Sequence, residues 1–124
     1  MNKADIRISV APRFIPEQSN PDAGKYFFSY TITLVNADAQ NYQLISREWL
    51  ITDGDGNEQK VIGEGVVGKQ PLIGSGESFS YTSGVLLDSP VGTMQGSYTL
   101  INDDKESVKA LIEPFLLAYP GAVN

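Results

Sequence analysis

The chain of 124 residues has 15 acidic and 9 basic side chains, a net charge of −6, and neither cysteine nor histidine. Without these two residue types there is no disulfide, no thiolate nucleophile and no catalytic triad built on histidine. An acidic chain with no cluster of lysine or arginine repels phosphate backbones, so we expect no nucleic-acid partner. An enzyme would have to work with carboxylates, lysine, tyrosine and serine alone, and we expect neither catalysis nor a cofactor.

The length is that of one domain, and we expect residues 1–124 to form it. The hydrophobic content of 41% is ordinary, and no apolar run approaches the roughly 18 residues that span a bilayer. Alternating sequence follows residue 5 directly, without the apolar core of a signal peptide. These features predict a cytoplasmic protein without membrane insertion, in agreement with the absence of cysteine.

In the first half of the chain, apolar and polar residues alternate with the period of two that is typical of β-strands. The alternation covers residues 6–10 until Pro12 interrupts it, and it is clearest over residues 26–34. It resumes over residues 42–52, where Arg47 is the polar member of an otherwise apolar row. The apolar members of that row are Ile45, Trp49 and Ile51.

Turn signals divide the second half of the chain into shorter strands. Residues 53–57 (DGDGN) and 102–105 (NDDK) predict two hairpins, because glycine and asparagine accept the positive φ of tight turns. Pro114 should end the last strand or place it at the edge of a sheet. The expected strands cover residues 58–63, 78–85, 93–101 and 108–112.

About seven short strands, no helical periodicity and a lone tryptophan on the third strand predict an all-β fold. The pattern favours an antiparallel β-sandwich of the immunoglobulin or fibronectin type III kind. A small closed barrel is the second possibility.

The glycines Gly63, Gly65 and Gly68 match the G-x-G-x-x-G pattern of dinucleotide-binding folds. That pattern needs a helix after the turn, and residues 69–76 carry a proline and two further glycines, which disfavour a helix. Two interpretations remain open. The glycines belong to a structural loop, or they form a loose anion-binding nest that Lys69 assists.

A second candidate site is the acidic hairpin. Asp53, Asp55 and Asn57 occupy positions one, three and five of a calcium-loop pattern, with Glu64 at position twelve. Position six should be glycine and is Glu58, and the flanks are strands, so an EF-hand is excluded. The residues therefore form either an ordinary exposed turn or a weak site for Mg²⁺ or Ca²⁺.

The loop after Gly63 is unusually apolar, since it contains Val66, Val67, Pro71 and Leu72. Loops normally lie at the surface, so these residues either cap the end of the sandwich or offer a patch to a partner. Two interpretations of Arg47 also remain. It is either an ordinary surface arginine or presents its guanidinium at an interface.

Several segments of the sequence resemble the ApaG family of small bacterial proteins. They follow one another at the family's spacing over nearly the whole chain. The family often has a histidine before the tryptophan, where this chain has Glu48, so any role of that histidine does not carry over. The segments are Arg47–Gly54, Val61–Ile73, Gly76–Gly84, Gly92–Tyr98 and Pro114–Leu117.

The resemblance implies an immunoglobulin-like or fibronectin-like sandwich of poorly defined activity, linked in bacteria to cobalt resistance and magnesium efflux. It also implies protein interaction, because similar domains in eukaryotic F-box proteins and in a polymerase-interacting protein look like interaction modules. Lacking histidine and cysteine, this chain is poorly equipped to hold Co²⁺ itself, so an indirect route through a partner is expected.

We therefore predict a non-catalytic module that binds another protein. The first candidate surfaces are the loop over residues 63–73 and an exposed sheet edge, and edge pairing would also allow a homodimer. The alternative is a module for phosphate, nucleotide or a divalent cation. A hydrolase that depends on carboxylates ranks last.

Overall fold

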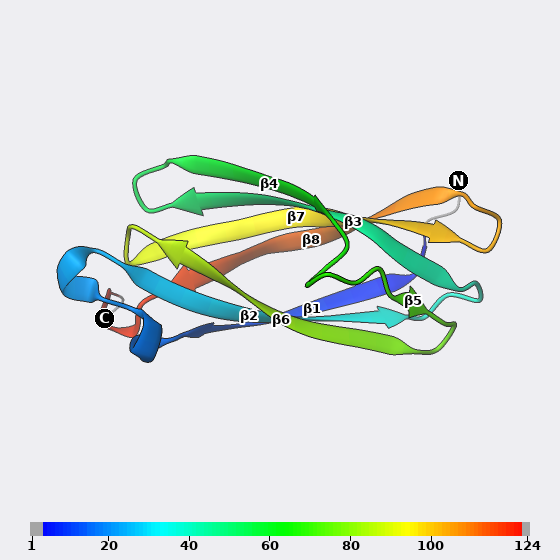
Figure 1. Cartoon of the computed structure of the whole chain (residues 1–124), viewed down its shortest axis with the longest axis horizontal. Coiled ribbons are helices and arrows are strands. Elements are labelled where there is room, and N and C mark those ends of the chain that lie inside the picture. Colours follow the sequence, from blue (N-terminus) through cyan, green and yellow to red (C-terminus); the bar gives the residue numbers. More distant parts are fainter. Residues whose placement is uncertain (1–3, 123–124) are drawn as a thin grey trace.

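A computed structural model describes residues 4–122, and in it two antiparallel sheets lie face to face (Figure 1). The smaller sheet has the order β1-β2-β6, with bounds β1 (Ile6–Phe14), β2 (Tyr26–Asn36) and β6 (Ser78–Leu87). The larger sheet has the order β4-β3-β7-β8, and β5 also pairs with β3. Its strands are β3 (Tyr42–Asp53), β4 (Glu58–Glu64), β5 (Leu72–Ile73), β7 (Val91–Asn102) and β8 (Ser107–Ala118).

The predicted β-sandwich is confirmed, and the closed barrel is excluded because the two sheets remain separate. Three single-turn 3₁₀ segments are the only helical elements between residues 4 and 122, and none has the length and hydropathy to cross a bilayer. They are η1 (Pro16–Gln18), η2 (Pro21–Ala23) and η3 (Pro120–Ala122).

The lone tryptophan lies in the core between the two sheets. Trp49 is 2% exposed. Its ring packs against the ring of Tyr30, which belongs to the opposite sheet, in an edge-to-face arrangement with a centroid distance of 5.4 Å. Tyr98 and Phe115 contact it from the other strands of its own sheet. Edge-to-face contacts of this kind add roughly 0.5–1.5 kcal/mol beyond the burial of the rings.

A β-bulge in β3 corrects the predicted row of side chains. The register with β7 shifts between Leu44 and Ser46, so Ile45 is the extra residue. Because one inserted residue reverses the alternation, Leu44 is buried before the bulge and Trp49 after it, although their parities differ. Ile45 is only partly buried and does not share the core row of Trp49.

Both prolines inside the predicted strands lie in edge strands. Pro12 does not interrupt β1, which continues to Phe14, because an edge strand tolerates a residue that cannot donate a hydrogen bond. Pro114 lies within β8, at a register shift relative to β7. The second alternative predicted for Pro114, an edge position, is the observed one.

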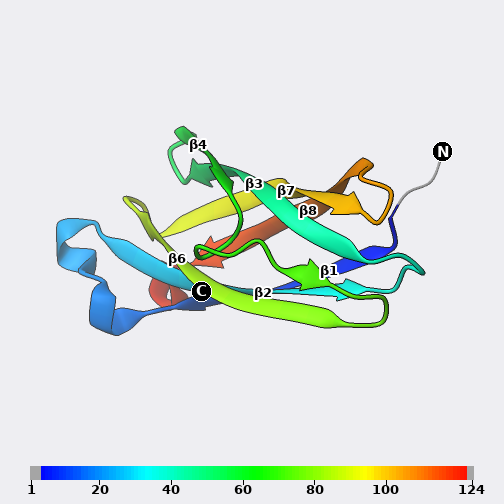
Figure 2. The same ribbon diagram turned by 45° about the vertical axis from the view of Figure 1, so that its right-hand side comes forward.

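The two long sides of the sandwich differ. On one side β1 lies against β8, and the rings of Phe14 and Tyr119 meet at 4.9 Å near that seam. On the other side, cavities separate β4 from β6. Figure 2 shows the connection from β4 to β5 descending from the larger sheet toward β6 on this open side. The open side is therefore where a ligand can reach the space between the sheets.

Two leucines of the larger sheet test this description of the core. Leu100 is fully buried on β7 and Leu111 is 72% exposed on the neighbouring β8. Leu100→Ala should lower the free energy of unfolding by about 2–5 kcal/mol, whereas Leu111→Ala should change it by less than about 0.5 kcal/mol. Chemical denaturation measures both. Equal losses in the two variants would contradict the assigned faces of this sheet.

Candidate functional site

A continuous groove runs along the open side between β6 and β4. Three adjoining cavities of about 250, 410 and 290 Å³ form it. The first two share Arg47 and Ser83, and the second and third share Gln59 and Leu86. Together they follow β6 from Tyr81 to Asp88, roughly 25 Å of extended chain.

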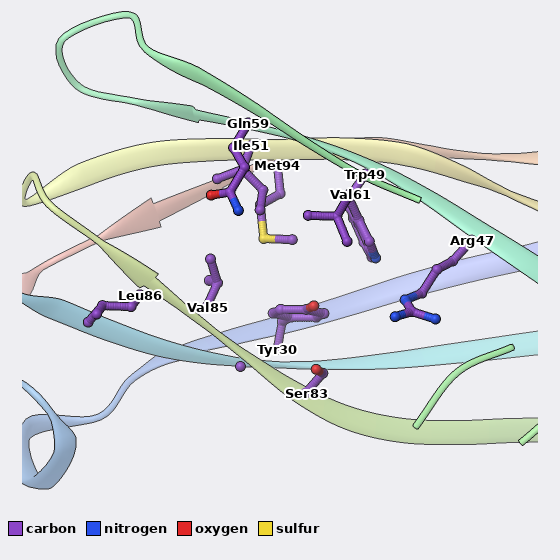
Figure 3. Close-up of a pocket in the computed structure, with 11 residues that line it drawn as sticks. Tyr30, Arg47, Trp49, Ile51, Gln59, Val61, Ser83, Val85, Leu86 and Met94 are labelled. Atoms are coloured by element: carbon purple, nitrogen blue, oxygen red, sulfur yellow. The ribbon is translucent and has the colours of Figure 1, made fainter. Parts of the chain in front are cut away.

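The backbone of β6 itself lines the groove. Four consecutive residues, Ser83–Leu86, border the central cavity. Side chains alternate between the two faces of a strand, so four residues in a row reach one cavity only when the free edge of the strand faces it. In Figure 3, Trp49, Val61 and Met94 point down from the larger sheet toward Tyr30 and Ser83, and β6 crosses the view diagonally below them.

β6 is unusual among the long edge strands of this molecule. Proteins protect exposed edges with charges, prolines or bulges that prevent a further strand from pairing. β6 has ten residues, no charged side chain, no proline and an unbroken register with β2. The other edge strands, β1, β4 and β8, all carry charges, and two of them carry proline. Those residues are Arg7, Pro12 and Arg13 of β1, Glu58, Lys60 and Glu64 of β4, and Lys109, Glu113 and Pro114 of β8.

The first glycine of the G-x-G-x-x-G pattern makes room for Arg47. Gly63 faces Arg47 in the β3–β4 register, and a Cβ on Gly63 would lie 2.9 Å from Nη1 and Nη2 of the guanidinium. In this position Nη1 donates hydrogen bonds to the carbonyls of Glu64 at 3.0 Å and Gly65 at 2.8 Å. The motif therefore holds an arginine of a neighbouring strand.

Arg47 is half-buried in the groove, and no acidic side chain between residues 4 and 122 forms an ion pair with it. The two ion pairs found between residues 4 and 122 join Arg7 to Asp5 and Lys25 to Asp88. Both hydrogen bonds of the guanidinium to the described part of the chain use Nη1. A half-buried positive charge without a partner favours an anionic group beside it.

The other two glycines shape the turn that follows. Gly65 has φ +63°, and a Cβ there would overlap the carbonyl oxygen of Lys69. Val67 (φ 49°) and Gly68 (φ +75°) both lie in the left-handed region, as in a type I′ turn. Left-handed backbone is unfavourable for a β-branched residue, so Val67 is held there by its surroundings.

The four residues predicted to contact a partner separate into two groups. Val66 is completely buried, so the prediction that it contacts a partner is wrong; its side chain anchors the turn in the core. Val67 and Leu72 are 62% and 70% exposed, and Pro71 is half-buried. Val67 lies at one end of the groove, whereas Leu72 borders a separate cavity with Ile101. The loop thus presents one apolar side chain to the groove.

The turn is poorly suited to cradle a phosphate. An anion nest needs successive N–H groups aimed at the ligand. Here Gly65 donates to the carbonyl of the bulged Ile45 at 2.7 Å, and Val66 and Lys69 donate to each other's carbonyls. With these N–H groups engaged, the geometry does not favour the phosphate or nucleotide hypothesis for Gly63, Gly65, Gly68 and Lys69.

The acidic hairpin forms the predicted turn, and the carboxylate of Asp53 accepts hydrogen bonds within that turn. Asp53 accepts hydrogen bonds from the N–H groups of Asp55 and Asn57 and from the Asn57 side chain. The bond from the Asn57 amide, with the backbone donors, holds the pKa of the Asp53 carboxyl below its usual value. Across residues 4–122, no group of three His, Cys, Asp or Glu side chains is arranged to hold a metal ion. Nothing in this geometry favours the cation hypothesis.

Two tyrosines near Arg47 connect the two sheets. The hydroxyls of Tyr81 on β6 and Tyr98 on β7 share a hydrogen bond that joins the two sheets. Burial raises the pKa of Tyr81 to about 12 and raises that of Tyr98 further. Both phenols are therefore neutral across the physiological range and serve as uncharged hydrogen-bonding groups.

Sequence reasoning singled out Arg47 but not the rest of the groove. Tyr30, Ser83 and the free edge of β6 gave no motif, because their importance comes from the open side of the sandwich. One signal was present in the sequence: the strand expected over residues 78–85 contains no charged residue and no proline. Such a strand is suspect wherever it lies at a sheet edge.

The fold and site define a class: a small antiparallel β-sandwich with a groove along one unprotected edge strand. The profile of the ApaG domain matches residues 16–102, which identifies the chain as a member of the ApaG family. Protein ApaG of Azotobacter vinelandii is 50% identical over 119 residues, covering 96% of this chain and 94% of that protein. Protein ApaG of a Methylobacterium species is 51% identical over 123 residues, covering 97% and 95%.

A solved structure agrees with these sequence relatives. The crystal structure of the putative ApaA protein from Bordetella pertussis superposes with a TM-score of 0.92 at 46% identity. The match covers 95% of this chain and 96% of that one. The sandwich architecture is therefore shared over almost the full length.

The strained turn can be tested through stability. Val67→Asn should raise the free energy of unfolding by about 1 kcal/mol, because asparagine adopts left-handed backbone at lower cost than valine. Val35→Asn is the matched control, since Val35 is also exposed but lies in the regular strand β2, where asparagine is unfavourable. Thermal and chemical denaturation give both values. Destabilisation by both substitutions would contradict the strain assigned to Val67.

Proposed function

We propose that this ApaG-family protein is a non-catalytic module that binds an extended segment of another protein along β6. The observation that carries the proposal is the free, uncharged edge of β6 facing a groove between the sheets. Strand addition supplies main-chain hydrogen bonds for affinity, and pockets for alternate side chains supply specificity. Both requirements have a counterpart in this groove.

The geometry of a sheet indicates where the added strand would lie. A strand pairs about 4.8 Å from its neighbour, and directly opposite side chains point to the same face. Residues opposite Ser83 and Val85 would therefore direct their side chains into the groove. The residue between them would face the outer surface opposite Gly84, where the ring of Phe27 lies against the strand.

A second copy of the chain is a less suitable occupant than a different protein. Two copies that each carry a net charge of −6 repel each other. Self-pairing would also bring only uncharged side chains into the groove, so the charge of Arg47 would stay uncompensated. The inward-facing residues of β6 are Phe79, Tyr81, Ser83, Val85 and Leu87.

The ionisable groups support a non-catalytic role. General acid–base catalysis works best with a pKa near the working pH. Among the described residues, each resolved shift moves a pKa further from neutral pH. The pKa values of the acids Asp38 and Asp53 fall, and those of Tyr42, Tyr81 and Tyr98 rise. The link to cobalt resistance and magnesium efflux that the family resemblance implies would then depend on the bound partner.

Selection from a phage-displayed library of random peptides, long enough to span the groove, tests the proposal. Selected peptides should bind Ser83→Lys at least about tenfold more weakly than the unmodified protein, because a lysine that points inward from an edge blocks strand addition. Ser9→Lys places the same charge on β1, the opposite edge of the same sheet, and should change affinity by less than about twofold.

The outcomes separate cleanly once circular dichroism and melting temperatures show that both variants fold. If no peptide is enriched, or if Ser9→Lys and Ser83→Lys reduce binding equally, strand addition to β6 is wrong. Sedimentation of the free protein provides a further check. A dimer that Ser83→Lys dissociates would assign the edge to a second copy instead.

A further inference from the structure

The chemical character of the groove changes along β6. At one end the half-buried guanidinium of Arg47 lies beside Ser83, and Glu64, whose backbone carbonyl accepts a hydrogen bond from that guanidinium, borders the same cavity. The central cavity is lined mainly by apolar side chains, among them Ile51, Val61 and Met94. The far end is acidic, because Asp53, Glu58 and Asp88 border the third cavity. From Tyr81 to Asp88, one residue past the end of β6, the groove therefore presents first a guanidinium, then apolar side chains and then a group of carboxylates.

These three regions coincide with successive inward-facing positions of β6. Ser83 lies beside Arg47, Val85 borders the central cavity, and Leu87 borders the acidic one. Directly paired residues of neighbouring strands point to the same face. An added strand therefore directs every second side chain into one region after another.

We propose that the groove recognises an extended partner segment by the order of its inward-facing side chains: acidic, apolar and basic, at alternate positions. The acidic side chain lies opposite Ser83 and meets Arg47, the apolar one fills the central cavity, and the basic one lies opposite Leu87. This inference rests on strand addition to β6 and adds the chemistry of the partner to it.

Arg47 is built to receive a carboxylate. Its hydrogen bonds from Nη1 to Glu64 and Gly65 fix the plane of the guanidinium, and Gly63 leaves room for it. Nε and Nη2 have no acceptor within residues 4–122 and offer the planar fork that pairs with a carboxylate. A prearranged fork loses little freedom on binding, so the contact favours acid over amide.

The acidic end is fixed in a similar way. The carboxyl group of Asp53 is held by the Asn57 amide and the turn N–H groups, which lower its pKa and keep it ionised. Asp88 pairs with Lys25 at 2.6 Å on its outer side. Glu58 has no ion-pair partner in the described part of the chain. A lysine or arginine of the partner would meet a net negative charge here.

The same peptide library tests the charge order with two matched variants, Arg47→Gln and Glu58→Gln. Selection on the unmodified protein should enrich peptides with an acidic and a basic residue four positions apart and an apolar residue midway. Selection on Arg47→Gln should lose the preference for the acid and keep that for the base. Selection on Glu58→Gln should weaken the preference for the base alone. A merely structural role of Arg47 would weaken all three preferences together.

Affinity measurements complete the test. Replacing the acid of a selected peptide by its amide should weaken binding to the unmodified protein about tenfold, and binding to Arg47→Gln by less than about twofold. If the amide peptide binds the unmodified protein as tightly, the charge order is wrong, while strand addition remains supported by the Ser83→Lys result. If no selected peptide responds to Ser83→Lys, the proposed function fails, and the charge order fails with it.

Discussion

The hydrogen bonds from the Arg47 guanidinium to the carbonyls of Glu64 and Gly65 organise the open side of this protein. They can form only because Gly63 has no side chain where the guanidinium lies. They hold the end of β4 in place, and the turn that follows buries Val66 and presents Val67. The same guanidinium remains available to the groove through Nε and Nη2. One arginine thus stabilises the rim of the groove and places a positive charge at this end of it.

The asymmetry of the sandwich follows from how its edges are covered. Where β1 meets β8, prolines and charges protect both strands and aromatic rings fill the seam. On the other side, β4 is charged but β6 is not, and cavities lie between them. An exposed uncharged edge is an aggregation hazard for a soluble protein. Its presence beside a groove of ordered charge is the physical reason to connect it with binding.

Much of the fold could be predicted from the sequence because the alternation of apolar residues is strong and the hairpin turns have clear chemistry. Which side chains of β3 face the core could not be predicted, because the bulge at Ile45 is determined by pairing with β7 rather than by local propensity. Proline normally breaks a strand, and the sequence does not reveal that the strand of Pro12 lies at a sheet edge, where proline is tolerated. Val66 and Val67 are chemically identical neighbours, and only the left-handed turn decides which one is buried.

The site was harder to predict for the same reason. The residues after the glycine pattern argue against the helix of a dinucleotide fold, but the role of Gly63 in accommodating Arg47 depends on a cross-strand register between residues 16 positions apart. The groove depends on which two sheet edges are left apart. Residues such as Ser83 and Tyr30 line the groove only because of that arrangement. Local chemistry therefore predicted the elements, and tertiary pairing determined the site.

The central claim is that a partner strand pairs with the free edge of β6, and nuclear Overhauser contacts in the complex with a selected peptide test it most directly. With isotope-labelled protein and unlabelled peptide, the account predicts backbone contacts to residues 81–88 in the regular pattern of paired strands. Contacts confined to the outer face of the larger sheet, around Ile62 and Leu111, would contradict it.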